Sequence, residues 1–208
     1  MKPAVPDHVG DPVDQSRIRT LPNALTMLRL LLVPVFATLL VSHGGHDSSS
    51  RLTAAVVFTI AAGTDLVDGE LARRRHQVTT FGKIADPIAD KALTGTALLL
   101  LSWLGDLPWW ITSVIITREL AVTLLRFRVI HLGVIPASRG GKAKTAFQIL
   151  AIVLYLIPLA HVLLPLRVVA IGVALALTLA TGFDYVMRAG KLRRQSIAAP
   201  LSVEPTSP

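Results

Sequence analysis

Four aspartates lie in two pairs between residues 65 and 90. Asp65 and Asp68 are three residues apart, and Asp86 and Asp90 are four residues apart. On helices, both spacings place the two carboxylates of a pair on one face. Two antiparallel helices joined by a short turn would bring the pairs to the same depth. The chain has no cysteine, and the cluster has no histidine, so its all-oxygen ligands favour Mg²⁺, Mn²⁺ or Ca²⁺.

A salt-bridge network is the alternative use of these carboxylates, because three arginines, residues 73–75, follow closely. Four facing carboxylates repel one another and are costly to desolvate unless cations neutralise them. The two regular spacings favour metal over arginine. Gly69 and Ala72 would leave room beside the metal for a bulky ligand, and Arg73 could reach a phosphate on it. Together these residues indicate a diphosphate substrate.

The elements that must position these residues are strongly apolar. The chain is 52% hydrophobic and 16% charged, with a mean hydropathy of +0.59, which is unusual for a soluble domain. The apolar runs predict six helices of membrane-spanning length. They cover residues 23–42, 52–75, 83–104, 108–131, 144–163 and 166–189. A soluble helical bundle is the alternative, but Ala151–Leu164 and Val168–Ala180 leave no polar face for water.

Lysines and arginines favour one side of this arrangement. With six spans, only Arg51 and Arg167 would fall on the opposite side, so both termini and the aspartates should face the cytoplasm. We therefore expect an all-α integral protein of the cell membrane, with six transmembrane helices and a cytoplasm-facing polar cavity. One domain would cover residues 17–190, between flexible tails at 1–16 and 191–208. The net charge of +8 then suits anionic lipid headgroups and does not require a nucleic-acid partner.

The aspartate-rich segment resembles a known family signature. Asp65-x2-Asp68-Gly69-x2-Ala72-Arg73-x8-Gly82-x3-Asp86-x3-Asp90 is similar, with no departure, to that of the CDP-alcohol phosphatidyltransferases. Residues 22–26 and Arg29 resemble the amino-terminal segment of that family. Residues 86–91, 117–120 and 141–145 resemble its phosphatidylglycerophosphate synthase branch, particularly from actinobacteria. The resemblance covers roughly residues 20–190.

The resemblance implies a reaction and its residues. Such enzymes move the phosphatidyl group of CDP-diacylglycerol to an alcohol and release CMP; in this branch the alcohol is sn-glycerol 3-phosphate. It implies a homodimer in which Asp65, Asp68, Asp86 and Asp90 surround two divalent ions, Mg²⁺ or Mn²⁺, with Asp90 also the general base. The implied CDP-diacylglycerol contacts are Asn23, Thr26, Asp68, Gly69, Ala72, Arg73 and Thr79.

The acceptor phosphate would need cations. Arg118 is the best candidate, because an arginine inside a membrane span is expensive and usually functional. The alternative is an ion pair with Glu119 or with an aspartate. Lys142 and Lys144 are favoured mainly by the resemblance, and a basic cytoplasmic loop would also explain them. The remaining candidates are Arg126 and Arg139.

Other functions remain open from the residues alone. A sister transferase could use inositol phosphate, serine or phosphatidylglycerol, since the signature does not separate acceptors. A divalent-cation transporter could use the aspartates as its transport site, although such sites usually lie at the midplane of the membrane. A lipid-binding scaffold would leave the base position and the small residues unexplained.

Overall fold

The structure is a computed structural model. It describes residues 21–75, 80–129, 139–159 and 163–198, with side chains except at 21–23, 65–75, 80–87, 126–127, 129, 139 and 192–198. These residues form six α-helices and one short 3₁₀ helix. The elements are α1 (Leu21–Val41), η1 (Ser42–Gly45), α2 (Ser48–Arg75), α3 (Thr80–Trp103), α4 (Trp109–Val129), α5 (Arg139–Leu156) and α6 (Leu164–Ala198).

The six predicted helices are confirmed, with differences at their ends. The largest concern α5, which begins five residues before the predicted start and ends at Leu156 rather than 163, and α6, which continues to Ala198 rather than 189. Pro158 explains the early end of α5, because the residue before a proline avoids helical geometry. After Pro165, in the first turn of α6, the next proline is Pro200, so no helix breaker interrupts it.

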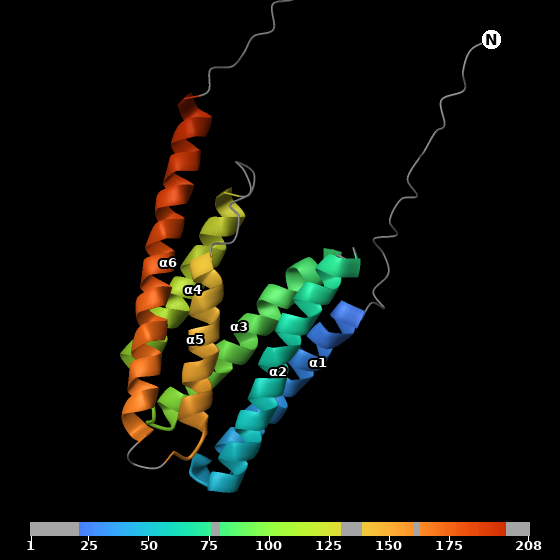
Figure 1. The fold of residues 1–208 in the computed structure, drawn as a ribbon, viewed down its shortest axis with the longest axis vertical. Coiled ribbons are helices and arrows are strands. Elements are labelled where there is room, and N and C mark those ends of the chain that lie inside the picture. The colour runs from blue at the N-terminus through green and yellow to red at the C-terminus, as the bar shows by residue number, and fades with distance from the viewer. Residues whose placement is uncertain (1–20, 76–79, 130–138, 160–162, 199–208) are drawn as a thin grey trace, which may run out of the picture.

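The helices pack as two groups of three. Figure 1 shows α1, α2 and α3 side by side, and α4, α5 and α6 beside them. Contacts of α2 and α3 with α5, and of α3 with α4, join the two groups. Large apolar side chains fill the centre: the Phe36 and Phe58 rings lie 5.5 Å apart, and Leu101 and Ile152 are fully buried. The fold is therefore all-helical throughout its described part.

Among the described helices, two segments are long and apolar enough to cross a membrane. They are Ala24–Gly45, which includes most of α1, and Leu164–Lys191 in α6. The described surface is also apolar; Leu31, Val169 and Phe183 are each more than 60% exposed. These exposed apolar side chains lie on the two helices of membrane-spanning length, where they could face lipid. The fold is thus consistent with a membrane location.

A tight connection leads from α1 into α2. Gly45 adopts a φ of +76°, and an added Cβ would clash with the Leu104 side chain, so glycine is favoured there. Asp47 then caps α2: its Oδ2 accepts hydrogen bonds from the Ser50 amide at 2.8 Å and the Ser49 hydroxyl at 2.7 Å. These hydrogen bonds, that of the Ser49 hydroxyl above all, lower the pKa of Asp47 from 3.8 to about 2.

Arg51 fastens the start of α2 to the end of α5. Its guanidinium donates to the carbonyls of Gly45 at 3.0 Å, Tyr155 at 2.8 Å and Leu156 at 3.3 Å. It also pairs with Asp106 Oδ2 at 2.7 Å. We call these groups the Arg51 cluster. Because the last carbonyls of a helix have no partner within it, Arg51 satisfies two that α5 leaves free.

Candidate active site

The predicted metal ligands lie on two consecutive helices that pack against each other. Asp65 and Asp68 belong to α2, and Asp86 and Asp90 belong to α3. The side chains of the first three lie outside the described residues, so their approach to one another stays a prediction. Among the described side chains, no three acidic or histidine residues cluster. The donor set of four carboxylates nevertheless has the chemistry that hard divalent cations prefer.

Several predicted CDP-diacylglycerol contacts also lie outside the described side chains. They are Asn23 at the start of α1, Asp68, Gly69, Ala72 and Arg73 on α2, and Thr79 before α3. Thr26 is described and fully buried on α1. One turn later Arg29, also fully buried, donates from Nε to the Ala61 carbonyl of α2 at 3.2 Å. The start of α1 therefore packs one turn before Asp65.

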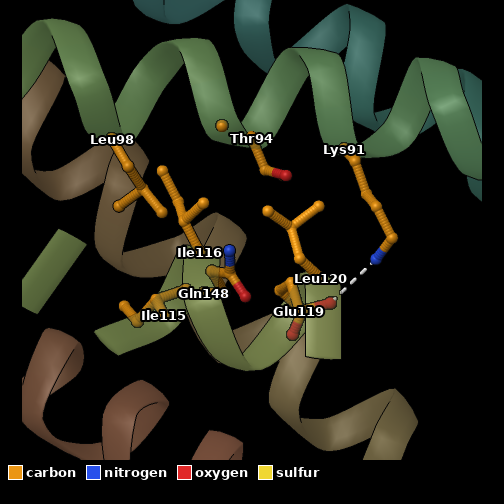
Figure 2. A pocket seen from close by; sticks show the side chains of 9 residues that line it. Lys91, Thr94, Leu98, Ile115, Ile116, Glu119, Leu120 and Gln148 are labelled. Carbon is orange, nitrogen blue, oxygen red and sulfur yellow. Dashed lines mark hydrogen bonds and ion pairs between the residues drawn. The ribbon is translucent and has the colours of Figure 1, made fainter. Parts of the chain in front are cut away.

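Asp90 connects the aspartate segment to a second group of charges. Its side chain is half-buried, and its backbone carbonyl accepts a hydrogen bond from the Thr94 hydroxyl at 2.9 Å. The next residue, Lys91, reaches across to α4 and pairs with Glu119 Oε2 at 3.0 Å (Figure 2). The predicted base is thus adjacent in sequence to a partly buried ion pair.

Glu119 is the centre of a three-helix charge cluster. Besides Lys91 of α3, its carboxylate binds Arg118 Nη1 of α4 at 2.8 Å and Lys144 Nζ of α5 at 2.6 Å. We call these four residues the Glu119 cluster. Within this cluster of described side chains, three cations and one carboxylate leave two surplus positive charges. Because the cluster is partly buried, its surplus charge is suited to bind an anion.

Helix α6 fixes the position of Arg118. The Nη2 atom of Arg118 donates to the Thr181 hydroxyl at 2.6 Å, and that hydroxyl donates to the Leu177 carbonyl at 2.7 Å. A Cβ added at Gly182 would lie 2.8 Å from Arg118 Nε. This Nε is buried without a hydrogen-bond partner in the described part of the chain. Arg118 therefore lies in a slot that the absence of a side chain at Gly182 keeps open.

The structure brings together two of the five predicted acceptor cations. Arg118 and Lys144 meet at Glu119, so the ion pair considered as the alternative for Arg118 is present. Lys142, in the first turn of α5, is exposed and lies outside the Glu119 cluster. The side chains of Arg126 and Arg139 lie outside the described residues.

Sequence reasoning missed Lys91, Thr181 and the central role of Glu119. A signal was available for Glu119, since a carboxylate inside an apolar helix needs a cationic partner. It was available for Lys91 too, which directly follows the predicted base. Thr181 had no such signal, because its role depends on how α6 lies against α4.

A cavity of about 70 Å³ adjoins the Glu119 cluster. It lies between α3, α4 and α5, as Figure 2 shows. Leu98, Ile115 and Ile116 form apolar walls, and Thr94 and Gln148 contribute polar groups beside the Lys91–Glu119 pair. The chain can therefore hold a small polar group one helical turn from its surplus charge.

Comparison with known proteins gives a consistent assignment. A family model described as CDP-alcohol phosphatidyltransferase matches residues 19–180. A Mycobacterium tuberculosis (strain H37Rv) protein named probable phosphatidylglycerophosphate synthase is 52% identical over 180 residues, 86% of each chain. A Bacillus subtilis protein named CDP-diacylglycerol–glycerol-3-phosphate 3-phosphatidyltransferase is 38% identical over 178 residues, covering 79% of this chain and 92% of that one.

A Pseudomonas fluorescens protein with the same name as the Bacillus relative is 42% identical over 146 residues, 65% of this chain and 71% of its own. The family match includes all of α1 to α5 and half of α6, and so contains every residue of the Glu119 cluster. The family suggested by the aspartate segment is thereby confirmed, and the match extends over most of the chain. This chain belongs to the CDP-alcohol phosphatidyltransferase family.

Proposed function

We propose that this phosphatidyltransferase moves the phosphatidyl group of CDP-diacylglycerol to sn-glycerol 3-phosphate, giving phosphatidylglycerophosphate and CMP. The names of the relatives from Bacillus and Pseudomonas support this acceptor. The observation that carries the proposal is the Glu119 cluster, with its two surplus positive charges. Glycerol 3-phosphate is close to a dianion at neutral pH, so its phosphate matches that surplus.

We propose that all six helices span the cell membrane, with both termini and the aspartates on the cytoplasmic side. The apolar lengths of α1 and α6 support this, as does the distribution of lysine and arginine. At the opposite end of the bundle, Trp103, Trp109 and Trp110 are more than half exposed. Exposed tryptophans suit the interface between lipid and water. A lipid donor and a water-soluble acceptor would meet at the other, charged boundary.

We propose that Asp65, Asp68, Asp86 and Asp90 hold two divalent cations, Mg²⁺ or Mn²⁺. The family is generally dependent on divalent cations, and the four carboxylates supply only oxygen ligands. Bound there, the ions would polarise the diphosphate and neutralise charge on the departing CMP. A homodimer, implied by the family resemblance, completes the proposal.

The chain's own residues would bind the two substrates, orient the acceptor and deprotonate its attacking hydroxyl. Asp90 accepts the proton of the acceptor hydroxyl as its oxygen bonds to the phosphorus that carries diacylglycerol. The bond from that phosphorus to the CMP oxygen breaks, and CMP leaves with the electron pair. Arg118 and Lys144 hold the acceptor phosphate and so orient the attacking hydroxyl. The proposed CDP-diacylglycerol contacts are Asn23, Thr26, Asp68, Gly69, Ala72, Arg73 and Thr79.

Three further cations are proposed for the path of the acceptor phosphate. Lys142 is exposed near Lys144, at the start of α5. Arg126 lies near the end of α4, and Arg139 begins α5. A cation transporter, the alternative from another class, finds no support in the matched enzyme family.

The test is CMP release by detergent-purified protein given CDP-diacylglycerol, Mg²⁺ and glycerol 3-phosphate. We expect release to require all three. Asp90→Asn should lower kcat by about 10²–10⁴-fold, the usual contribution of a general base. Asp184→Asn is the matched control, because this aspartate is half-exposed in a surface pair with Arg188. Release with inositol phosphate or serine instead would keep the mechanism and change the acceptor; full turnover by Asp90→Asn would exclude the assigned base.

A further inference from the structure

We propose that the cavity between α3, α4 and α5 receives the carbon chain of the acceptor, and that the Gln148 amide recognises its central hydroxyl. This inference rests on the proposed function, because it deepens the same acceptor site. It assigns Gln148 a specificity role that neither the family signature nor the Glu119 cluster provides.

The Gln148 amide needs a partner that the protein does not supply. The side chain is only 4% exposed, and no described residue forms a hydrogen bond with it. It lines the cavity together with Leu98, Ile115 and Ile116, which are apolar (Figure 2). The amide atoms are not among the fully enclosed polar atoms that lack a partner, so they can be reached from the cavity. A polar group inside the cavity could therefore form the hydrogen bonds that the protein does not supply.

The size and lining of the cavity indicate a small hydroxylated group. Its volume of about 70 Å³ exceeds the roughly 30 Å³ that one water molecule occupies in the liquid. An acyl chain would leave the amide unsatisfied beside the Lys91–Glu119 pair. A hydroxyl can both donate to the amide oxygen and accept from the amide nitrogen, and Gln148 offers both groups.

Helical spacing places the cavity near the residues proposed to bind the two ends of the acceptor. Gln148 follows Lys144 by four residues on α5, so it lies about one turn, roughly 6 Å, further along the same face. Thr94 follows Asp90 by four residues on α3 and is bonded to the Asp90 carbonyl. With the acceptor phosphate on Lys144 and the attacking hydroxyl at Asp90, the central hydroxyl would remain for Gln148.

The decisive experiment compares two acceptors. 3-Hydroxypropyl phosphate keeps the phosphate and the attacking hydroxyl of glycerol 3-phosphate but lacks the central hydroxyl. We expect the wild-type protein to prefer glycerol 3-phosphate by about tenfold or more in kcat/KM, because the analogue leaves Gln148 unpaired. In Gln148→Met, kcat/KM should fall about tenfold for glycerol 3-phosphate and little for the analogue. Phe147→Met is the control, because this neighbour on α5 is 38% exposed and does not line the cavity.

A second variant tests the space itself. Gly95 lines the cavity, and a Cβ added there meets no atom within 4 Å. Gly95→Ala should therefore fold, with an unchanged or higher Tm, since alanine favours a helix. Its methyl group should raise the KM for glycerol 3-phosphate severalfold and leave the KM for CDP-diacylglycerol unchanged. Gly172→Ala, on α6 and also in open space, should change neither constant.

The outcomes separate this inference from the proposed function. Equal losses with both acceptors in Gln148→Met, or a higher Tm without a change of KM in Gly95→Ala, would make the cavity a packing void or a water site. In that case wild-type turnover of glycerol 3-phosphate would still support the proposed function. If the wild-type protein used neither glycerol 3-phosphate nor 3-hydroxypropyl phosphate, the proposed acceptor and this inference would both be overturned.

Discussion

Two partly buried charge clusters differ in how their charges are balanced. In the Arg51 cluster, one guanidinium meets one carboxylate and three backbone carbonyls, so charge and hydrogen bonds are balanced. In the Glu119 cluster, one carboxylate meets three cations, and Arg118 Nε has no partner among the described residues. A balanced network stabilises the fold by itself, whereas surplus positive charge favours the binding of an anion.

The two clusters also contact different parts of α5. The carboxyl end of α5 is tied to α2 through the Tyr155 and Leu156 carbonyls. Earlier on the same helix, Lys144 belongs to the Glu119 cluster and Gln148 lines the cavity. One end of α5 is therefore fixed to α2 by a structural contact, and a separate part of the same helix carries the side chains that face the cavity.

The largest expected effect is on stability, from Arg51→Met. The variant would leave the Asp106 carboxylate and the last carbonyls of α5 without their donor. We expect the free energy of unfolding to fall by about 3 kcal/mol. Thermal unfolding in detergent would measure this, while the KM for glycerol 3-phosphate of the remaining folded protein should be unchanged.

Arg51→Lys is the matched control for that experiment. Lysine keeps the ion pair with Asp106 but lacks the planar group that reaches several carbonyls at once. Its stability should therefore be intermediate. If Arg51→Met were as stable as the wild type, or if it raised the KM for the acceptor, the division between a structural and a functional cluster would be wrong.

A smaller effect, on the acceptor alone, is expected from Gly182→Ala. The new Cβ would lie 2.8 Å from Arg118 Nε and 3.3 Å from its Cγ, so the side chain must shift. Arg118 would lose its position between Glu119 and Thr181. We expect kcat/KM for glycerol 3-phosphate to fall about tenfold, the effect of one weakened charge-assisted hydrogen bond. The KM for CDP-diacylglycerol should not change.

Gly172→Ala provides the comparison, because it makes the same substitution on α6 where nothing lies within 4 Å of the new Cβ. Equal kinetics for both variants would mean that the position of Arg118 does not determine acceptor binding. An equal loss in both would assign the effect to the helix rather than to the slot.

How far the sequence could predict the molecule depends on the range of each interaction. The helices follow from local apolar runs, and the prediction failed mainly at the ends of α5 and α6, where prolines rather than hydropathy decide. The aspartate spacings were local as well. Glu119 meets its lysine partners across 28 and 25 residues, and Arg118 meets Thr181 across 63. Such contacts require the packing of four helices, which local patterns do not give.

Some missed residues did leave a local trace. Gln148 is the only strongly polar side chain in the apolar run from Ala146 to Tyr155, and Glu119 interrupts an apolar helix in the same way. Each pattern predicts a buried polar group that needs a partner. Neither pattern identifies the partner, because the register between helices decides it. No local sequence pattern identifies Gly182, because its role is to leave space for the Arg118 side chain of another helix.

The smallest expected effect concerns a carboxylate outside both clusters. Asp47 caps α2 just before Arg51, and its hydrogen bonds hold its pKa at about 2 instead of 3.8. A lowered folded-state pKa means that the cap stabilises the protein above about pH 4 and that this stability is lost as pH falls toward 2. Asp47→Ala should therefore lower Tm slightly at pH 7, and by less at pH 3, without changing acceptor kinetics.

Asp47→Asn separates the cap from its charge. Asparagine caps a helix about as well as aspartate but does not titrate in this range. Its Tm at pH 7 should match the wild type, and between pH 4 and pH 3 it should lose less than the wild type does. A pH-independent deficit in Asp47→Ala would instead mean that packing at the α1–α2 connection, around Gly45 and Leu104, carries the stability of this end of α2. The Arg51 cluster would then depend on that packing rather than on the capped first turn beside it.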